Sequence, residues 1–249
     1  MRNIKVTVKY DGSNYRGFQR QTDNLPTIQQ ALEGVLTDIT KHPVIINGAG
    51  RTDAGVHALG QIINFKTPCR IPADRICLVM NRLLPKDIVA LEAEEVDWSF
   101  HAQFKAKRKI YRYHIYNSRI PPAFERLYSY YVPKKLDVEA VREAAKFFVG
   151  EHDFSAFKSA ESKTRLKARS PVKNICRLDI EYSPPHLYFE IEGNGFLYNM
   201  VRIISGTLLY VGIHKLALID VKRTIETGNR LGAGPTLPPQ GLYLMEVIY

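Results

Sequence analysis

Cysteine is scarce in this chain, and the few cysteines lie far apart. They are Cys69, Cys77 and Cys176 among 249 residues. An odd number of cysteines with no Cys-x-x-Cys pair argues against a disulfide framework and against a zinc knuckle. His57 and His101 also lack neighbours at metal-ligand spacing, so we expect no metal. A reduced, cytoplasmic compartment fits this composition.

Long apolar runs are missing as well. No stretch reaches the roughly 20 apolar residues that span a membrane, and Met1-Arg2-Asn3-Ile4 leads into a strand pattern rather than a signal-peptide core. No Gly-Lys-Ser/Thr follows the glycines of residues 48–55, and no Gly-x-Gly-x-x-Gly occurs. The sequence therefore predicts neither a membrane protein nor a P-loop nucleotide-binding protein.

Acidic residues are outnumbered by basic ones. Lys and Arg total 35 against 25 Asp and Glu, a formal net charge of +10 at pH 7. This excess favours a polyanionic partner such as nucleic acid. A basic surface with no specific partner is the alternative.

What the chain does contain is regular apolar patterning in both halves. Period-two alternation and short apolar runs predict strands at residues 4–10, 44–46, 61–67, 88–96, 109–116, 172–182, 187–192 and 242–248. Helical spacing predicts helices at residues 27–39, 72–84, 137–149, 200–211 and 219–227. Thr27 and Asp137 are expected N-caps, and the second helix is expected to bury Ile76, Val79, Met80 and Leu83.

This mixture predicts an α+β fold. We expect two similar split β-α-β lobes, of the ferredoxin-like or RRM kind, at residues 1–103 and 104–249. Their antiparallel or mixed sheets are expected to join around a central catalytic cleft.

The most informative segment is Gly50-Arg51-Thr52-Asp53-Ala54-Gly55-Val56-His57. Closely spaced glycines after a strand allow a tight turn and a close backbone approach. Asp53 would then present its carboxylate on that turn beside the cationic Arg51. This arrangement suits a catalytic aspartate that acts on a polyanion, although a turn-capping aspartate is the simpler alternative.

Three other segments combine groups that suit nucleic-acid binding or buried charge. They are residues 10–21, residues 100–113 and residues 193–204. The first two mix aromatic and basic residues, as a stacking and phosphate-binding surface does. In the third, Arg202 lies in an almost wholly apolar helix and requires an acidic partner. Asp53 is the natural partner, with Glu190 and Glu192 as alternatives.

Taken together, these segments resemble the TruA-type tRNA pseudouridine synthase family over nearly the whole chain, from Tyr10-Asp11-Gly12 to Gly241-Leu242-Tyr243-Leu244. The resemblance implies Asp53 as the catalytic nucleophile and Arg202 as its ion-pair partner. It implies Tyr111 as the aromatic residue against the target uracil and Arg51 as the residue that helps hold the flipped base. Phe100, His101, Ala102, Gln103 and Phe104 match an RNA-binding stretch, and Leu242 is a further expected substrate contact.

Gln103 departs from that family pattern, because many relatives carry Arg at this position, and one phosphate contact is therefore in question. The resemblance implies an enzyme that isomerises uridine to pseudouridine at positions 38, 39 and 40 of the tRNA anticodon stem-loop. It also implies a homodimer that needs no cofactor.

Two other classes of function are consistent with parts of the sequence. A non-catalytic RNA-binding protein or RNA chaperone would use the same basic cleft, but it has no use for an anion there. A metal-dependent nuclease would need further acids beside Asp53, and none is close in sequence. A related synthase with another RNA target is the alternative within the same class.

Overall fold

The computed structural model of the chain describes residues 1–21, 25–159 and 170–249. The chain divides into two compact units. Unit 1 comprises Met1–Lys107 and Tyr243–Tyr249, and unit 2 comprises Arg108–Leu242. No helix in the described ranges is long and apolar enough to cross a membrane. The division of the sequence into lobes 1–103 and 104–249 stays a prediction.

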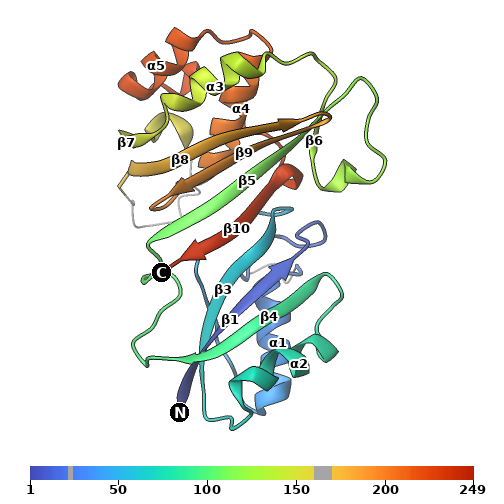
Figure 1. Cartoon of the computed structure of the whole chain (residues 1–249). Coiled ribbons are helices and arrows are strands. Elements are labelled where there is room, and N and C mark those ends of the chain that lie inside the picture. Colours follow the sequence, from blue (N-terminus) through green and yellow to red (C-terminus); the bar gives the residue numbers. More distant parts are fainter. Residues whose placement is uncertain (22–24, 160–169) are drawn as a thin grey trace. The chain divides into compact units, whose positions relative to one another are not determined.

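Unit 1 is a sheet with two helices packed on it (Figure 1). Its strands are β1 (Arg2–Tyr10), β2 (Asn47–Gly48), β3 (His57–Thr67), β4 (Ile88–Val96) and β10 (Leu242–Ile248), and its helices are α1 (Ile28–Thr40) and α2 (Ala73–Leu83). The central strand β1 pairs antiparallel with β3 and β4. Strand β10 pairs parallel with β3, and β2 pairs antiparallel with β3. The C-terminal strand thus belongs to the sheet that the N-terminal strand begins.

The helices of unit 1 follow the sequence pattern with two differences. Thr27 caps α1 as predicted, since its side chain accepts a hydrogen bond from the Gln30 backbone N–H. Glu33, however, is buried on the same face as the apolar residues. In α2 the prediction for Leu83 was wrong, because its side chain is 53% exposed. Cys77 is buried instead, one position from the expected face.

The approach to the Asp53 segment also differs from prediction. Residues 44–46 are not a strand, and only Asn47–Gly48 pairs with β3. Strand β3 begins at His57, four residues earlier than the apolar pattern suggested. The Asp53 turn therefore leads directly into the long strand β3.

In unit 2 the strands are mostly antiparallel, and helices cover the sheet that they form (Figure 1). Its strands are β5 (Arg108–Asn117), β6 (Tyr130–Val132), β7 (Gly150–Asp153), β8 (Val172–Ser183) and β9 (His186–Gly193). They are ordered β5-β9-β8-β7, with β6 parallel to β5. The helices are α3 (Val138–Lys146), α4 (Met200–Gly212) and α5 (Leu218–Thr227); 3₁₀ turns lie at Glu125–Leu127, Ser155–Phe157, Arg230–Gly232 and Pro239–Gly241.

Alternation decides which residues of β5 and β9 enter the core of unit 2. Tyr113, Ile115, Phe189 and Ile191 are fully buried, and successive side chains point to opposite faces of a strand. Asp137 caps α3 as predicted, accepting a hydrogen bond from the Ala140 N–H at 3.0 Å. Helix α4 is the most buried helix, with 11 of its 13 residues buried. The predicted α+β fold is therefore confirmed, whereas the cleft between lobes stays a prediction.

Candidate active site

Asp53 lies on a tight turn at the start of β3. The Val56 N–H donates to the Asp53 carbonyl at 3.1 Å, and Gly55 adopts a φ of +76°, which glycine tolerates far better than other residues. The Asp53 side chain is half-buried. Its carboxylate is thus carried by a defined turn rather than a loose loop.

Buried polar side chains of β1 and β3 form hydrogen bonds with this turn. The amide of Gln61, fully buried on β3, donates to the Gly50 carbonyl at 2.7 Å and accepts from the Gly50 N–H at 3.3 Å. The Tyr10 hydroxyl lies 2.8 Å from the Thr52 hydroxyl. Burial raises the pKa of Tyr10 to about 12, despite hydrogen bonds with Thr52 and Gln61 that lower it. Tyr10 therefore stays neutral and acts as a hydrogen-bonding support.

A second loop, within the predicted segment 10–21, packs against the Asp53 turn. The Phe18 N–H donates to the Thr52 carbonyl at 3.0 Å, and the Gly55 N–H donates to the Tyr15 carbonyl at 3.3 Å. Gly17 adopts a φ of +92°, and a Cβ there would lie 2.7 Å from the Thr52 carbonyl oxygen. The close approach of the two backbones therefore requires glycine at this position.

The segment from Phe100 to Phe104 is anchored by two buried asparagines. Asn3 donates to the Phe100 carbonyl at 3.0 Å, and Asn64 accepts from the Ala102 N–H at 2.9 Å. Asn64 also donates to the side chain of Asn3 at 2.9 Å. This anchoring leaves the Phe104 ring 76% exposed, with the His101 ring centroid 4.2 Å away.

Three of the predicted substrate-binding residues share one pocket in unit 1. Arg51, His101 and Gln103 come from two separate segments, and they line a pocket of about 180 Å³. The other lining residues are Phe18, Gln19, Gln29, Ile46, Asn47 and Gly48. Ala102 does not line it, because its side chain is fully buried. The structure thus brings the Arg51 turn and the 100–104 segment together at one surface hollow.

Tyr111 and Arg202 lie in unit 2. Tyr111 is 8% exposed on β5, and the Phe196 ring meets it edge-on at 5.2 Å. Arg202, half-buried on α4, donates to the Leu237 carbonyl and to the Asn199 side chain, both at 2.7 Å. Leu242 is 6% exposed at the start of β10. Because Asp53 belongs to unit 1, its pairing with Arg202 stays a prediction.

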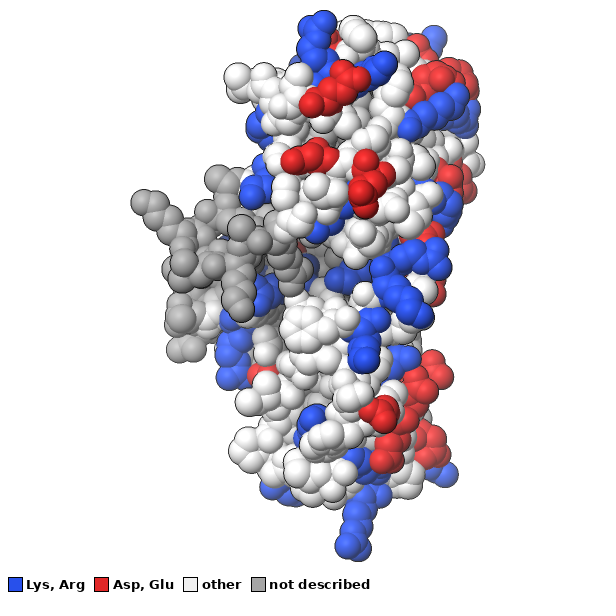
Figure 2. All heavy atoms as spheres, turned by 90° about the vertical axis from the view of Figure 1, so that its left-hand side faces the viewer, with Lys and Arg blue, Asp and Glu red and all other residues white. Residues whose placement is uncertain are grey.

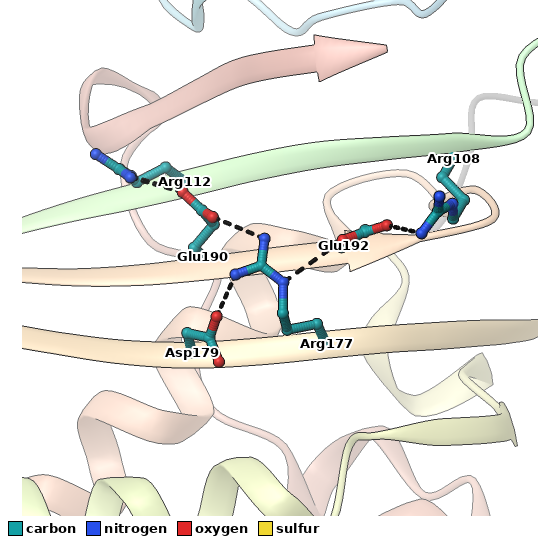
Figure 3. A network of polar contacts seen from close by, with 6 residues as sticks. All are labelled: Arg108, Arg112, Arg177, Asp179, Glu190 and Glu192. Atoms are coloured by element: carbon teal, nitrogen blue, oxygen red, sulfur yellow. Dashed lines mark hydrogen bonds and ion pairs between the residues drawn. The ribbon is translucent and has the colours of Figure 1, made fainter. Parts of the chain in front are cut away.

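The alternative partners of Arg202 are engaged elsewhere. Figure 3 shows a network in which Glu190 binds Arg112 at 2.7 Å and Arg177 at 2.9 Å. Glu192 binds Arg108 and lies 3.5 Å from Arg177, which also binds Asp179. Burial opposes ionisation of Glu190, but hydrogen bonds from Arg112 and Arg177 outweigh it and lower its pKa.

This network also limits the predicted RNA surface on β5. Three arginines face three acids on one side of the sheet, so the network carries no net charge. Tyr113, on the opposite side, is core, and its hydroxyl donates to the Pro238 carbonyl at 2.7 Å. On the face drawn in Figure 2, Lys and Arg side chains lie among both uncharged and acidic ones. Phosphate binding is therefore expected from cations outside the β5 network.

Sequence reasoning missed the buried supports Gln61, Asn3 and Asn64. Gln61 and Asn64 flank Ile62 and Ile63 in an otherwise apolar strand, and polar residues at such positions need hydrogen-bond partners. The sequence shows these polar positions within an apolar strand, but it does not show their hydrogen-bond partners. Among the described residues, no group of three or more His, Cys, Asp or Glu is arranged to hold a metal ion.

The chain matches known proteins over its whole length. A family model described as tRNA pseudouridine synthase matches residues 6–105 and 144–249. The tRNA pseudouridine synthase A of Acetivibrio thermocellus is 49% identical over 249 residues, covering 100% of both chains. The proteins of that name from Thermoanaerobacter sp. (strain X514) and Caldicellulosiruptor bescii are 45% and 44% identical, again over 100% of both chains.

Proposed function

Since the chain belongs to the tRNA pseudouridine synthase family, we propose that it isomerises uridine to pseudouridine in tRNA. The observation that carries the proposal is the full-length match to relatives of that name. The family model includes Asp53 and Arg202, while Tyr111 falls between its two matched ranges. The proposed targets are positions 38, 39 and 40 of the anticodon stem-loop.

The reaction is an internal rearrangement. The bond between N1 of the uracil and C1′ of the ribose breaks, the uracil turns, and C5 bonds to C1′. The proton that leaves C5 is balanced by a proton gained at N1, so nothing is oxidised or added. A side-chain nucleophile and a way to move one proton are sufficient.

Asp53 is the proposed nucleophile. A carboxylate attacks a sugar carbon in retaining glycosidases, and addition to C6 of the uracil is the other route. Either route needs an ionised carboxylate, and a nearby cation favours that form. Arg202 is proposed as this cation. The turn supported by Gly50, Thr52 and Gln61 would hold Asp53 ready for attack.

The remaining residues are proposed to hold the RNA. The target base must leave its stack, at a cost of a few kcal/mol. Arg51, exposed beside the pocket, would help hold the flipped nucleotide, and Tyr111 would stack on the uracil. Phosphate contacts from the basic surface would offset the cost of flipping. Phe100, His101, Gln103, Phe104 and Leu242 are further proposed contacts, with Ala102 contributing through its backbone.

The deciding experiment uses tRNA that carries tritium at C5 of uridine. Purified protein without any added cofactor should release tritium and form pseudouridine. Asp53→Asn should release none, yet should keep most of the tRNA affinity, because that affinity comes mainly from phosphates. Pseudouridine formation by this variant would refute the nucleophile assignment. Tight binding without tritium release by the unaltered protein would instead indicate a non-catalytic RNA-binding protein.

The assembly and compartment are part of the same proposal. We infer a homodimer in the cytoplasm, where its tRNA substrate is processed. Sedimentation of the purified protein should give twice the chain mass of 28.4 kDa without tRNA, and that mass plus the mass of the bound tRNA when tRNA is present. A monomer under both conditions would contradict the dimer.

A further inference from the structure

Neutral amides are the commonest side chains around the pocket that Arg51 helps to line. Of its nine lining residues, four are Gln or Asn, and Arg51 is the single Lys or Arg. Phosphates are usually held by cations and backbone N–H groups. Amides instead offer donors and acceptors together. The lining therefore suits the edge of a nucleobase better than a phosphate.

Three of these amides have free hydrogen-bonding capacity. Among described residues, the side chains of Gln19, Asn47 and Gln103 make no hydrogen bond to another part of the protein. The fourth, Gln29, is held at both ends. Its nitrogen donates to Glu33 at 2.8 Å, and its oxygen accepts from the Arg20 N–H at 3.0 Å. A ligand in the pocket would thus meet three amides without displacing a protein contact.

The lining residues of the pocket are held in place by contacts with buried side chains. Glu33 is 5% exposed, and it accepts hydrogen bonds from the Ile46 N–H at 3.1 Å and from Arg20 at 2.6 Å. The buried Phe18 ring packs so closely on Gly48 that a Cβ there would lie 2.4 Å from it. Walls fixed in this way need little ordering when a ligand binds.

Asp53 itself is not a lining residue, although Arg51, two residues earlier, is. The Cα atoms of two residues that are two positions apart lie at most about 8 Å from each other. The pocket therefore lies close to the Asp53 turn, although Asp53 does not line it. We propose that it binds the unpaired base of a nucleotide next to the target uridine, with Asn47 and Gln103 hydrogen-bonded to the base edge. This inference rests on the proposed function. Unstacked bases are commonly recognised by side chains on their edges.

The test uses RNA stem-loops that contain the target uridine. In a matched set, each neighbouring nucleotide in turn is made abasic, which removes the base and keeps the ribose and phosphate. One abasic position should weaken binding to the unaltered protein by about tenfold, the loss expected for one or two hydrogen bonds. In the double variant Gln103→Met with Asn47→Leu, intact RNA should bind about tenfold more weakly. The abasic change should then have no further effect.

The matched control is Gln30→Met, which alters the neighbour of Gln29 in α1 outside the pocket lining. This variant should discriminate against the abasic RNA as the unaltered protein does. Equal losses by the double variant on intact and every abasic RNA would show contact with the backbone and overturn the base pocket. Insensitivity of the unaltered protein to all abasic positions would overturn it without any variant. Tritium release from intact RNA separately decides the proposed function.

Discussion

At the scale of single residues, the described arginines of unit 2 lie in different surroundings. Arg108, Arg112 and Arg177 are neutralised by acids on their own sheet. Arg202, on the largely buried helix α4, donates hydrogen bonds to the Leu237 carbonyl and to the Asn199 side chain. The role proposed for its charge is to favour the ionised form of Asp53.

We expect Arg202→Met to lower turnover by orders of magnitude. Arg202→Lys should retain part of the activity, because it keeps the charge but loses the planar fork of donors. Loss of the cation disfavours an ionised carboxylate, so the Met variant should recover partly as pH rises. Rate profiles against pH, with thermal melts of all three proteins, check this. Normal turnover in the Met variant would show that Asp53 does not depend on Arg202.

His114 makes stability depend on pH. Burial lowers its pKa to about 4, despite a hydrogen bond with the Tyr128 carbonyl that favours the charged form. At a pH below about 6.5, the ordinary pKa of histidine, His114 is protonated in the unfolded chain but stays neutral in the folded protein. The free energy of unfolding should therefore decrease as pH falls from about 6.5 toward 4, in the manner of a histidine buried in its neutral form.

Denaturant titrations at several pH values measure this effect. His114→Gln should flatten the dependence in that window. An equally steep dependence in His114→Gln would assign the effect to other groups.

At the scale of elements, the Asp53 turn is held by close backbone contact with the Tyr15–Phe18 loop. Gly17→Ala should destabilise the protein by more than 1 kcal/mol, since it combines a positive φ with a clash at 2.7 Å. Turnover should also fall, because the clash is with the Thr52 carbonyl beside Asp53. Gly34→Ala is the control, as a Cβ there meets nothing within 4 Å, and in helix α1 it should stabilise by up to about 1 kcal/mol. Normal turnover in a destabilised Gly17→Ala would mean that the loop supports the fold alone.

The 100–104 segment depends on buried asparagines in β1 and β3. Asn64→Leu would leave the Ala102 N–H and the Asn3 oxygen without this partner, at about 1–3 kcal/mol for each buried group. We expect a lower melting temperature and, because the segment loses its anchor, weaker tRNA binding. Melts and binding titrations below the melting temperature separate the two effects. Unchanged affinity in the destabilised variant would remove the segment from the RNA-binding surface.

At the scale of the whole molecule, the net charge of +10 should govern binding to RNA. The logarithm of affinity should fall linearly with the logarithm of salt concentration, with a slope of roughly −0.7 to −0.9 per phosphate contact. Titrations of tRNA between low and physiological salt measure that slope. A nearly flat response would contradict the electrostatic argument and would favour a small substrate.

Most of the helices and strands of this protein could be predicted from its sequence. Apolar periodicity predicted both β-α patterns, because burial of one face is a local property of spacing. The residues around Asp53 indicated a catalytic turn and, by resemblance, the family that full-length relatives then showed. The predictions that Leu83 is buried and that residues 44–46 form a strand were wrong. Which side of an element is buried, and whether a short apolar run pairs as a strand, depend on the neighbouring elements.

Only the tertiary structure decided which residues meet. It joined Arg51 to His101 and Gln103 around one pocket, paired Glu190 and Glu192 with other arginines, and set Gln61 and Asn64 beneath the functional segments. It also placed the last strand beside β3. These contacts join residues far apart in the chain, and hydrogen bonds and ion pairs need distances of a few ångströms. The spacing of residues in a sequence does not give these distances. The hydrogen-bond and ion-pair partners of the polar side chains could therefore be identified only from the structure.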